Sequence, residues 1–173
     1  MKTPWTQRAL HAAQYAIEHG HVCVFITITL PSRFHPGCRR PGRAIPITPK
    51  DGYRWLHNIW DKTRADMVRR GIPMYGVRMV DQHPDGTPHW HVLACLPTQS
   101  GADVLQALMR RNMPAGDTGG RHVTATGYAP VAEGIAHYAD KASDSRVQAW
   151  ASIWGIRLGA SFGLPGDVAG GAA

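Results

Sequence analysis

The sequence predicts an α+β fold in which helices pack on a central antiparallel sheet of four or five strands. Helix-periodic segments are interspersed with segments rich in β-branched residues along the 173-residue chain. Two strand segments flank residues 82–87, whose Asp85-Gly86 dipeptide is typical of an antiparallel hairpin. A hairpin among mixed elements favours α+β. We expect one domain at residues 1–162 and a flexible Gly- and Ala-rich tail at 163–173.

Capping signals mark the first two helices. Thr3 and Pro4 open the first helix as its N-cap and first residue. Thr48 and Pro49 open the second in the same way, and Asp51 completes a capping-box pattern. The second helix has one apolar face at three- and four-residue steps, formed by Tyr53, Leu56, Ile59, Trp60, Thr63 and Met67. These signals fix where both helices begin.

The remaining elements follow from period and turn residues. Between the first strand and the second helix, residues 31–47 contain four prolines and four arginines, which predicts a loop. In chain order, we predict helices at 3–20, 48–71, 100–112, 130–142 and 144–155, and strands at 21–31, 72–81, 87–97 and 121–128.

Composition narrows the function classes. The formal net charge is +7, and ten histidines add to it. Such a basic domain favours a nucleic-acid partner, although solubility charge is the plainer alternative. No apolar run reaches the roughly 20 residues of a membrane span, and no signal peptide is visible. Three cysteines without a C-x-x-C pair indicate a reducing, cytoplasmic compartment, with Cys23 and Cys95 as small buried hydrophobes.

A histidine pair lies inside the second strand of the hairpin. Side chains two residues apart share one face of a strand, so His89 and His91 project together and Trp90 projects oppositely. Asp81 ends the neighbouring strand and offers an acidic third ligand, suited to Mg²⁺ or Mn²⁺. Ligation needs neutral imidazole and should fail below about pH 6. The alternative is two hydrogen-bonded histidines that bind no metal.

A tyrosine and a lysine share one face of the helix at 130–142. Tyr138 precedes Lys141 by three residues, the spacing of neighbours on a helix surface. A phenol is a poor nucleophile at neutral pH unless a cation favours its phenolate. A half-buried tyrosine with a surface hydroxyl is the alternative.

Three stretches together resemble the HUH endonucleases, and among them the phage replication gene A protein family of rolling-circle initiators. The sequence VFITITLPSRFHP resembles the first motif strand, and YGVRMVDQHPDGTPHWHVLACLP resembles the histidine hairpin. The third stretch, ATGYAPVAEGIAHYADKASDSRVQAWASIWGIR, resembles the tyrosine helix with the segment after it. The resemblance covers about residues 24–162, most of the chain.

The resemblance implies an HUH nuclease fold and a metal-dependent enzyme that nicks and rejoins single-stranded DNA at a replication origin. It implies that Tyr138 forms a 5′-phosphotyrosine link with help from Lys141. It further implies that His89, His91 and Asp81 hold Mg²⁺ or Mn²⁺, although the family typically has Glu at the acidic position. Expected partners are origin DNA and a host helicase or polymerase, in the cytoplasm of a bacterial host cell.

Two departures from the family pattern affect these expectations. The family commonly has two tyrosines four residues apart, each followed by lysine, but Gly134 and His137 stand at the first pair of positions. Tyr128, expected at a strand end, is a poor substitute. One tyrosine predicts a single nick-and-rejoin turnover or reliance on a second subunit. The chain is also shorter than its relatives, as expected of a trimmed domain, a minimal relative or a decayed gene.

Basic and aromatic residues are candidate DNA contacts. Loop arginines suited to tracking phosphates are Arg33, Arg39, Arg40 and Arg43, with Arg110, Arg111 and Arg121 as further candidates. Tryptophans able to stack bases are Trp55, Trp60, Trp150 and Trp154, although helical spacing is more typical of core residues.

Three other protein classes share some of these features. A histidine-triad hydrolase needs a histidine where Leu93 stands. A two-histidine phosphoesterase needs two H-x-[ST] repeats, and residues 122–124 fit that pattern but 89–91 do not. A non-catalytic single-stranded DNA-binding module derived from an initiator remains open, because one tyrosine is missing.

Overall fold

A five-stranded antiparallel sheet forms the centre of the protein. The computed structural model describes residues 3–36, 47–113, 122–126 and 128–165. The strand order is β4-β1-β3-β2-β5, and every neighbouring pair is antiparallel. The strands are β1 (Val22–Ile28), β2 (Tyr75–Gln82), β3 (Pro88–Leu96), β4 (His122–Thr126) and β5 (Gly159–Phe162). The α+β prediction is confirmed.

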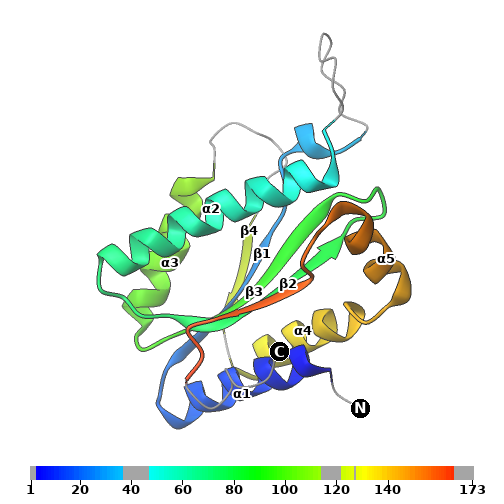
Figure 1. The fold of residues 1–173 in the computed structure, drawn as a ribbon. Helices are drawn as coiled ribbons and strands as arrows, with labels where there is room; N and C mark the ends of the chain where they lie inside the picture. The colour runs from blue at the N-terminus through cyan, green and yellow to red at the C-terminus, as the bar shows by residue number, and fades with distance from the viewer. Residues whose placement is uncertain (1–2, 37–46, 114–121, 127, 166–173) are drawn as a thin grey trace.

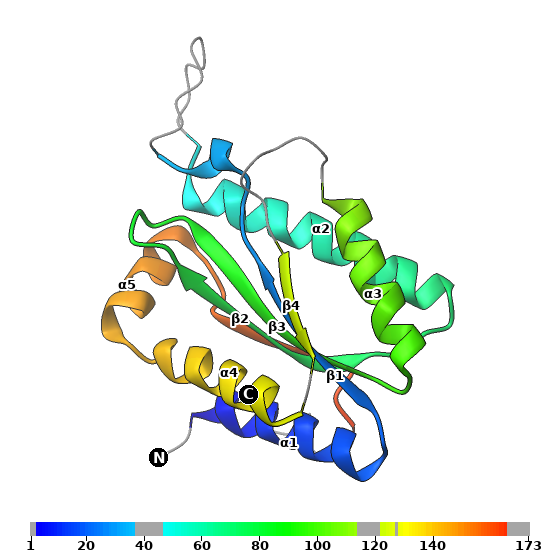
Figure 2. The ribbon, with the colours of Figure 1, turned by 180° about the vertical axis from the view of Figure 1, so that it is seen from behind.

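Helices cover both faces of the sheet, which gives three layers (Figure 1). The helices are α1 (Pro4–Glu18), α2 (Pro49–Arg69), α3 (Gln99–Asn112), α4 (Tyr128–Lys141) and α5 (Ser145–Trp154), with a short 3₁₀ turn η1 (Ser32–Phe34). Helices α2 and α3 lie on one face, and α1 and α4 lie side by side on the other, as the reverse view in Figure 2 also shows. No helix in the described part of the chain has the length and apolar character needed to cross a bilayer.

The alternating side chains of β3 contribute to two separate cores. Trp90, Val92, Ala94 and Leu96 pack with α2 and α3, whereas Leu93 and Cys95 pack with α1 and α4. Cys23 lies opposite Cys95 on β1, and both are buried, as predicted for small hydrophobes. Because His89 and His91 share the parity of Leu93, they belong to the face covered by α1 and α4.

One local prediction was wrong, and two elements of the structure were not predicted from the sequence. Strand β5 was not anticipated, because its four residues are mostly small and carry no β-branched side chain; pairing with the edge of β2 makes it a strand. Tyr128 begins α4 rather than ending a strand. The turn η1 lies within the expected loop at residues 31–47. Cys38 and the tail beyond residue 165 lie outside the described residues.

Candidate functional site

Asp81, His89 and His91 come together on the face of the sheet covered by α1 and α4. In the β2–β3 hairpin Asp81 pairs directly with His89, and Met79 pairs with His91. One ligand atom from each of Asp81, His89 and His91 lies within 4.8 Å of the others, and all three residues are buried. We call these three residues the ligand cluster. It is the triad expected from the sequence, and no other potential metal-binding group of this kind occurs among the described residues.

Two imidazole nitrogens in the ligand cluster are buried without a hydrogen-bond partner among the described residues. The first is Nε2 of His91, whose Nδ1 lies 3.0 Å from Oγ1 of Thr27. The second is Nδ1 of His89, whose Nε2 lies 3.8 Å from Oδ2 of Asp81. Buried polar atoms normally have partners, and a divalent cation at Asp81 would supply one for Nε2 of His91, while the Nε2 of His89 is the nitrogen of that ring nearest Asp81. The donor set therefore fits a metal ion.

Burial keeps both histidines neutral. Desolvation, with a smaller contribution from the neighbouring His83, lowers the pKa of His89 to about 4. Desolvation also lowers the pKa of His91 to about 2, with an added contribution from His89. Neutral imidazole is the form that binds metals. Burial therefore moves the acidic limit of ligation below the pH 6 expected from the sequence.

The aromatic ring of Tyr138 lies directly on the ligand cluster. It stacks on the His91 ring with the two centroids 3.3 Å apart and the planes 12° from parallel. Phe25 of β1 lies 5.7 Å from the His91 ring and 6.1 Å from the Tyr138 ring. Tyr138 is half-buried near the C-terminal end of α4. A phenol from a distant helix therefore meets the imidazole of a candidate ligand.

Lys141 also reaches the ligand cluster, one helical turn after Tyr138. Its Nζ donates to Oδ2 of Asp81 across 2.5 Å. The other carboxylate oxygen of Asp81 accepts from the backbone N–H of Gln82 at 2.8 Å. Lys141 and Tyr138, paired on one helix face from the sequence, thus both contact the cluster.

Two side chains of the hairpin turn lie outside the ligand cluster. The His83 ring lies 4.3 Å from the His89 ring, but His83 is not part of the three-residue group. Asp85 pairs instead with Nδ1 of His35 at 2.7 Å. Burial lowers the pKa of His83. The turn therefore borders the candidate metal site and does not extend it.

Only part of the predicted DNA-contact set can be placed. Arg33, in η1, lies over the rings of Phe34 and Trp55, 4.9 and 5.7 Å from their centroids. Arg111 forms an ion pair with Asp66 at the far side of the sheet, between α3 and α2. Four of the candidate arginines lie outside the described residues: Arg39, Arg40, Arg43 and Arg121.

The positions of the candidate tryptophans favour a role in the hydrophobic core over base stacking. Trp60 is 4% exposed and packs edge-on against Phe162. Trp55, Trp150 and Trp154 are partly buried against the same core. The indole N–H of Trp150 donates to the carbonyl of Gly86 at 3.2 Å, which ties α5 to the hairpin turn. Trp60 is therefore not available to stack on a base.

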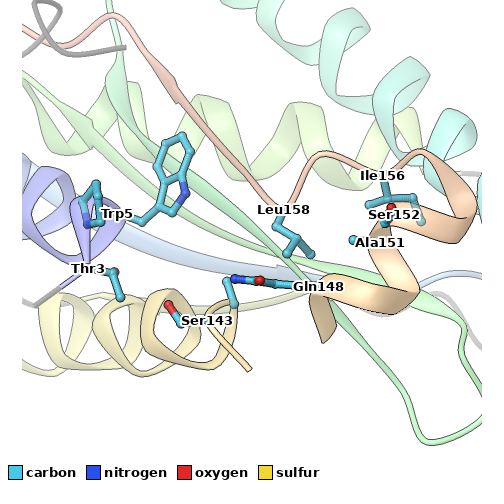
Figure 3. A pocket seen from close by; sticks show the side chains of 10 residues that line it. Thr3, Trp5, Ser143, Gln148, Ala151, Ser152, Ile156 and Leu158 are labelled. Carbon is cyan, nitrogen blue, oxygen red and sulfur yellow. The ribbon is translucent and has the colours of Figure 1, made fainter. Parts of the chain in front are cut away.

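A separate cavity of about 440 Å³ lies where α1 begins and α4 gives way to α5 (Figure 3). Its lining includes Trp5, Ser143, Gln148 and Leu158, and none of the ligand cluster. Ser143 follows Lys141 by two residues, so the cavity borders the C-terminal end of α4. The chemistry-bearing side chains lie outside this hollow, on the sheet face under α4.

Comparisons with known proteins show which family the chain resembles. The family model described as bacteriophage replication gene A protein matches residues 2–146. The chain is 32% identical to the replication gene A protein of Escherichia phage P2, over 88% of this chain and 25% of the relative. It is 30% identical to the replication protein of Haemophilus phage HP1, over 83% of this chain and 22% of the relative.

A third relative, named probable replication endonuclease from prophage-like region 1 of Salmonella typhi, is 30% identical over 85% of this chain and 22% of the relative. The chain thus spans about a quarter or less of the length of these curated relatives. No solved structure matches the chain. From the family match and the shared identity, the chain belongs to the bacteriophage replication gene A protein family.

Proposed function

We propose that this chain is the nicking and strand-transfer domain of a replication initiator that acts on single-stranded DNA at an origin and starts rolling-circle replication. The observation that carries the proposal is the stack of Tyr138 on His91, because it brings a nucleophile to a cluster with free ligand atoms. The names of family relatives, including a probable replication endonuclease, support the same reaction class.

Asp81, His89 and His91 would hold Mg²⁺ or Mn²⁺. When bound, such an ion polarises the scissile phosphate as a Lewis acid. The buried neutral histidines provide lone pairs for it. Thr27 Oγ1 lies 3.0 Å from Nδ1 of His91, and in the tautomer with its proton on Nδ1 the ring would donate to Thr27 and leave Nε2 free for the ion. The chain itself thus prepares three ligands on rigid neighbouring strands.

Tyr138 performs the covalent step of the proposal. Its hydroxyl oxygen attacks phosphorus, the bond from phosphorus to the 3′ oxygen breaks, and the 5′ phosphate stays on the tyrosine. The phenol loses its proton to solvent, and the departing 3′ oxygen gains one to become a 3′-OH. A polymerase can extend that end, and its return attack on the phosphotyrosine rejoins the strand without an outside energy source.

Tyr138 has no second tyrosine beside it at the family's usual spacing. His137 and Gly134 occupy the positions where another tyrosine-lysine pair commonly stands. We therefore infer one covalent attachment per active site, followed by rejoining or transfer to a second subunit. A host helicase and polymerase, in the cytoplasm of the bacterial host, would act on the exposed strand.

Covalent trapping tests this function. The full chain is incubated with Mn²⁺ and labelled single-stranded DNA from a phage origin, then run on a denaturing gel. We expect an SDS-stable adduct with the unaltered chain. Tyr138→Phe should lower the adduct yield by at least about a hundredfold, because Phe lacks the attacking oxygen. DNA binding should be retained in that variant.

Two outcomes contradict the proposal. An adduct that persists in Tyr138→Phe reassigns the nucleophile. DNA binding without any adduct in the unaltered chain, in Mn²⁺ or Mg²⁺, favours the non-catalytic binding module. Tyr53→Phe is a matched control, because Tyr53 lies on α2 across the sheet and should leave the adduct unchanged.

A further inference from the structure

Lys141 and His89 converge on the same oxygen of Asp81. Oδ2 of Asp81 lies 2.5 Å from Nζ of Lys141 and 3.8 Å from Nε2 of His89. The other oxygen, Oδ1, is held by the backbone N–H of Gln82. Oδ2 is therefore the oxygen that faces the ligand cluster, and an ammonium group sits on it.

The two partners of this ion pair differ in exposure. The Asp81 side chain is 5% exposed, so its charge needs a partner within the protein. The Lys141 side chain is 44% exposed and belongs to the last residue of α4. A long side chain at a helix end can rotate into solvent, whereas Asp81 is fixed in β2. Only Lys141 is free to leave the pair.

We propose that Lys141 is a resident cation that neutralises Asp81 until a divalent ion binds, and that it then turns outward to the phosphate held at Tyr138. An ammonium and a divalent cation repel each other, so the two compete for the same carboxylate oxygen. Lys141 stays on the face of α4 that carries Tyr138, three residues earlier, so its outward position lies beside the nucleophile. This positioning role rests on the proposed nuclease function.

The exchange has a consequence for metal affinity. Lys141 competes for Oδ2, so every metal-binding event must also break the ion pair. Removing its charge should strengthen metal binding, although the residue belongs to the nicking machinery. It should also destabilise the metal-free protein, because a buried carboxylate then lacks its cation. A lysine that only contacts DNA would produce neither effect.

Calorimetry on the full chain without DNA tests the exchange. Mn²⁺ is titrated into the unaltered protein and into the variants Lys141→Met and Lys141→Gln, each treated with EDTA and dialysed beforehand. Lys62→Met is the matched control, because Lys62 is exposed on α2, across the sheet. We expect both Lys141 variants to bind Mn²⁺ about tenfold more tightly than the unaltered protein. The melting temperature of the metal-free Lys141 variants should be lower than that of the unaltered protein, and Mn²⁺ should raise it by more. Lys62→Met should match the unaltered protein in both respects.

Unchanged or weaker Mn²⁺ binding in a folded Lys141 variant overturns the exchange. Lys141→Gln retains a hydrogen-bond donor to Asp81 without the charge, which keeps the test valid if the methionine variant fails to fold. The result is separable from the nuclease proposal. If the unaltered protein forms the DNA adduct but the Lys141 variants bind Mn²⁺ with unchanged affinity, only the exchange is contradicted. If the variants bind Mn²⁺ more tightly but the unaltered protein forms no adduct, the exchange is supported and the nuclease function is contradicted.

Discussion

His91 is the most constrained side chain of the ligand cluster. Thr27 lies 3.0 Å from its Nδ1, and Tyr138 stacks on its ring, with Phe25 nearby on β1. A ring held at one nitrogen and on one face has little rotational freedom, so the direction of its free Nε2 is fixed. At the residue scale, these contacts prepare the candidate ligand before any metal arrives.

The depressed pKa values of the two histidines predict an acid-sensitive fold. Unfolded histidine has a pKa near 6.5, whereas burial lowers the pKa of His89 to about 4 and of His91 to about 2 in the folded chain. The unfolded state therefore takes up protons first as the pH falls. The stability that the neutral histidines contribute is fully present above pH 6.5. It is lost as the pH falls toward 4 for His89 and toward 2 for His91, by about 2 kcal/mol per histidine at pH 5.

Urea unfolding of the metal-free protein at pH 7 and pH 5 measures this loss. His91→Gln should show about half of the pH dependence that the two cluster histidines produce. His11→Gln is the control, since His11 is exposed on α1 and is not among the groups that act on the two cluster histidines. Equal unfolding free energies at the two pH values would contradict the effect.

At the scale of elements, the β2–β3 hairpin sets the site. Its turn is closed by two backbone bonds, from His83 N–H to the Thr87 carbonyl and from Gly86 N–H to the His83 carbonyl, each 2.9 Å. Gly86 has φ +83°, a conformation that favours glycine. The resulting register puts Asp81 opposite His89. A one-residue slip would turn the histidines to the other face, under α2.

Helix α2 contributes to the stability of the fold and lies on the face of the sheet opposite the ligand cluster. Thr48 Oγ1 accepts from the N–H of Asp51, and Asp51 Oδ2 accepts from the N–H of Thr48, so the capping box predicted from the sequence is confirmed. We expect Thr48→Ala to lower the free energy of unfolding by about 1 kcal/mol in urea denaturation, because the first turn loses its cap. Mn²⁺ affinity and adduct yield should be unchanged, since α2 lies across the sheet.

Thr48→Ser is the matched control for the cap, because serine retains the accepting oxygen. A fall in Mn²⁺ affinity in Thr48→Ala at a temperature where the chain remains folded would show that α2 is coupled to the ligand cluster. That outcome would contradict the separation of the two faces.

At the scale of the whole molecule, charge and chemistry are distributed differently. The ligand cluster is buried under α4, whereas the net charge of +7 is spread over the chain. Arg33 lies in η1, which follows β1 in the chain. Phe25 and Thr27 of β1 contact His91 of the ligand cluster. A basic loop and the candidate site are therefore connected through a single strand.

This distribution predicts strongly salt-dependent binding of single-stranded DNA. Four phosphate contacts, one for each loop arginine, give a slope of about −3 in log affinity against log salt. Affinity should then fall about 50-fold between 50 and 200 mM salt in fluorescence anisotropy. Arg33→Ala should make the slope shallower by about 0.7, whereas Arg33→Lys should retain it. Binding that is independent of salt would exclude phosphate tracking by these arginines.

The sequence by itself determined the features that depend on near neighbours. Period-two spacing put His89 and His91 on one face, the Asp85-Gly86 turn brought Asp81 beside them, and Thr48 placed the start of α2. Each of these depends on interactions within a few residues or across one tight turn, so local spacing was sufficient to predict it.

Only the tertiary structure decided which distant segments meet. Thr27 and His91 are 64 residues apart, and Lys141 and Asp81 are 60 apart. Their contacts require β1 to pair with β3 and α4 to lie over the same face of the sheet, and β5 exists because β2 offers it an edge. Such pairings are selected by the joint burial of apolar faces from separate elements, a property that no local stretch of sequence contains.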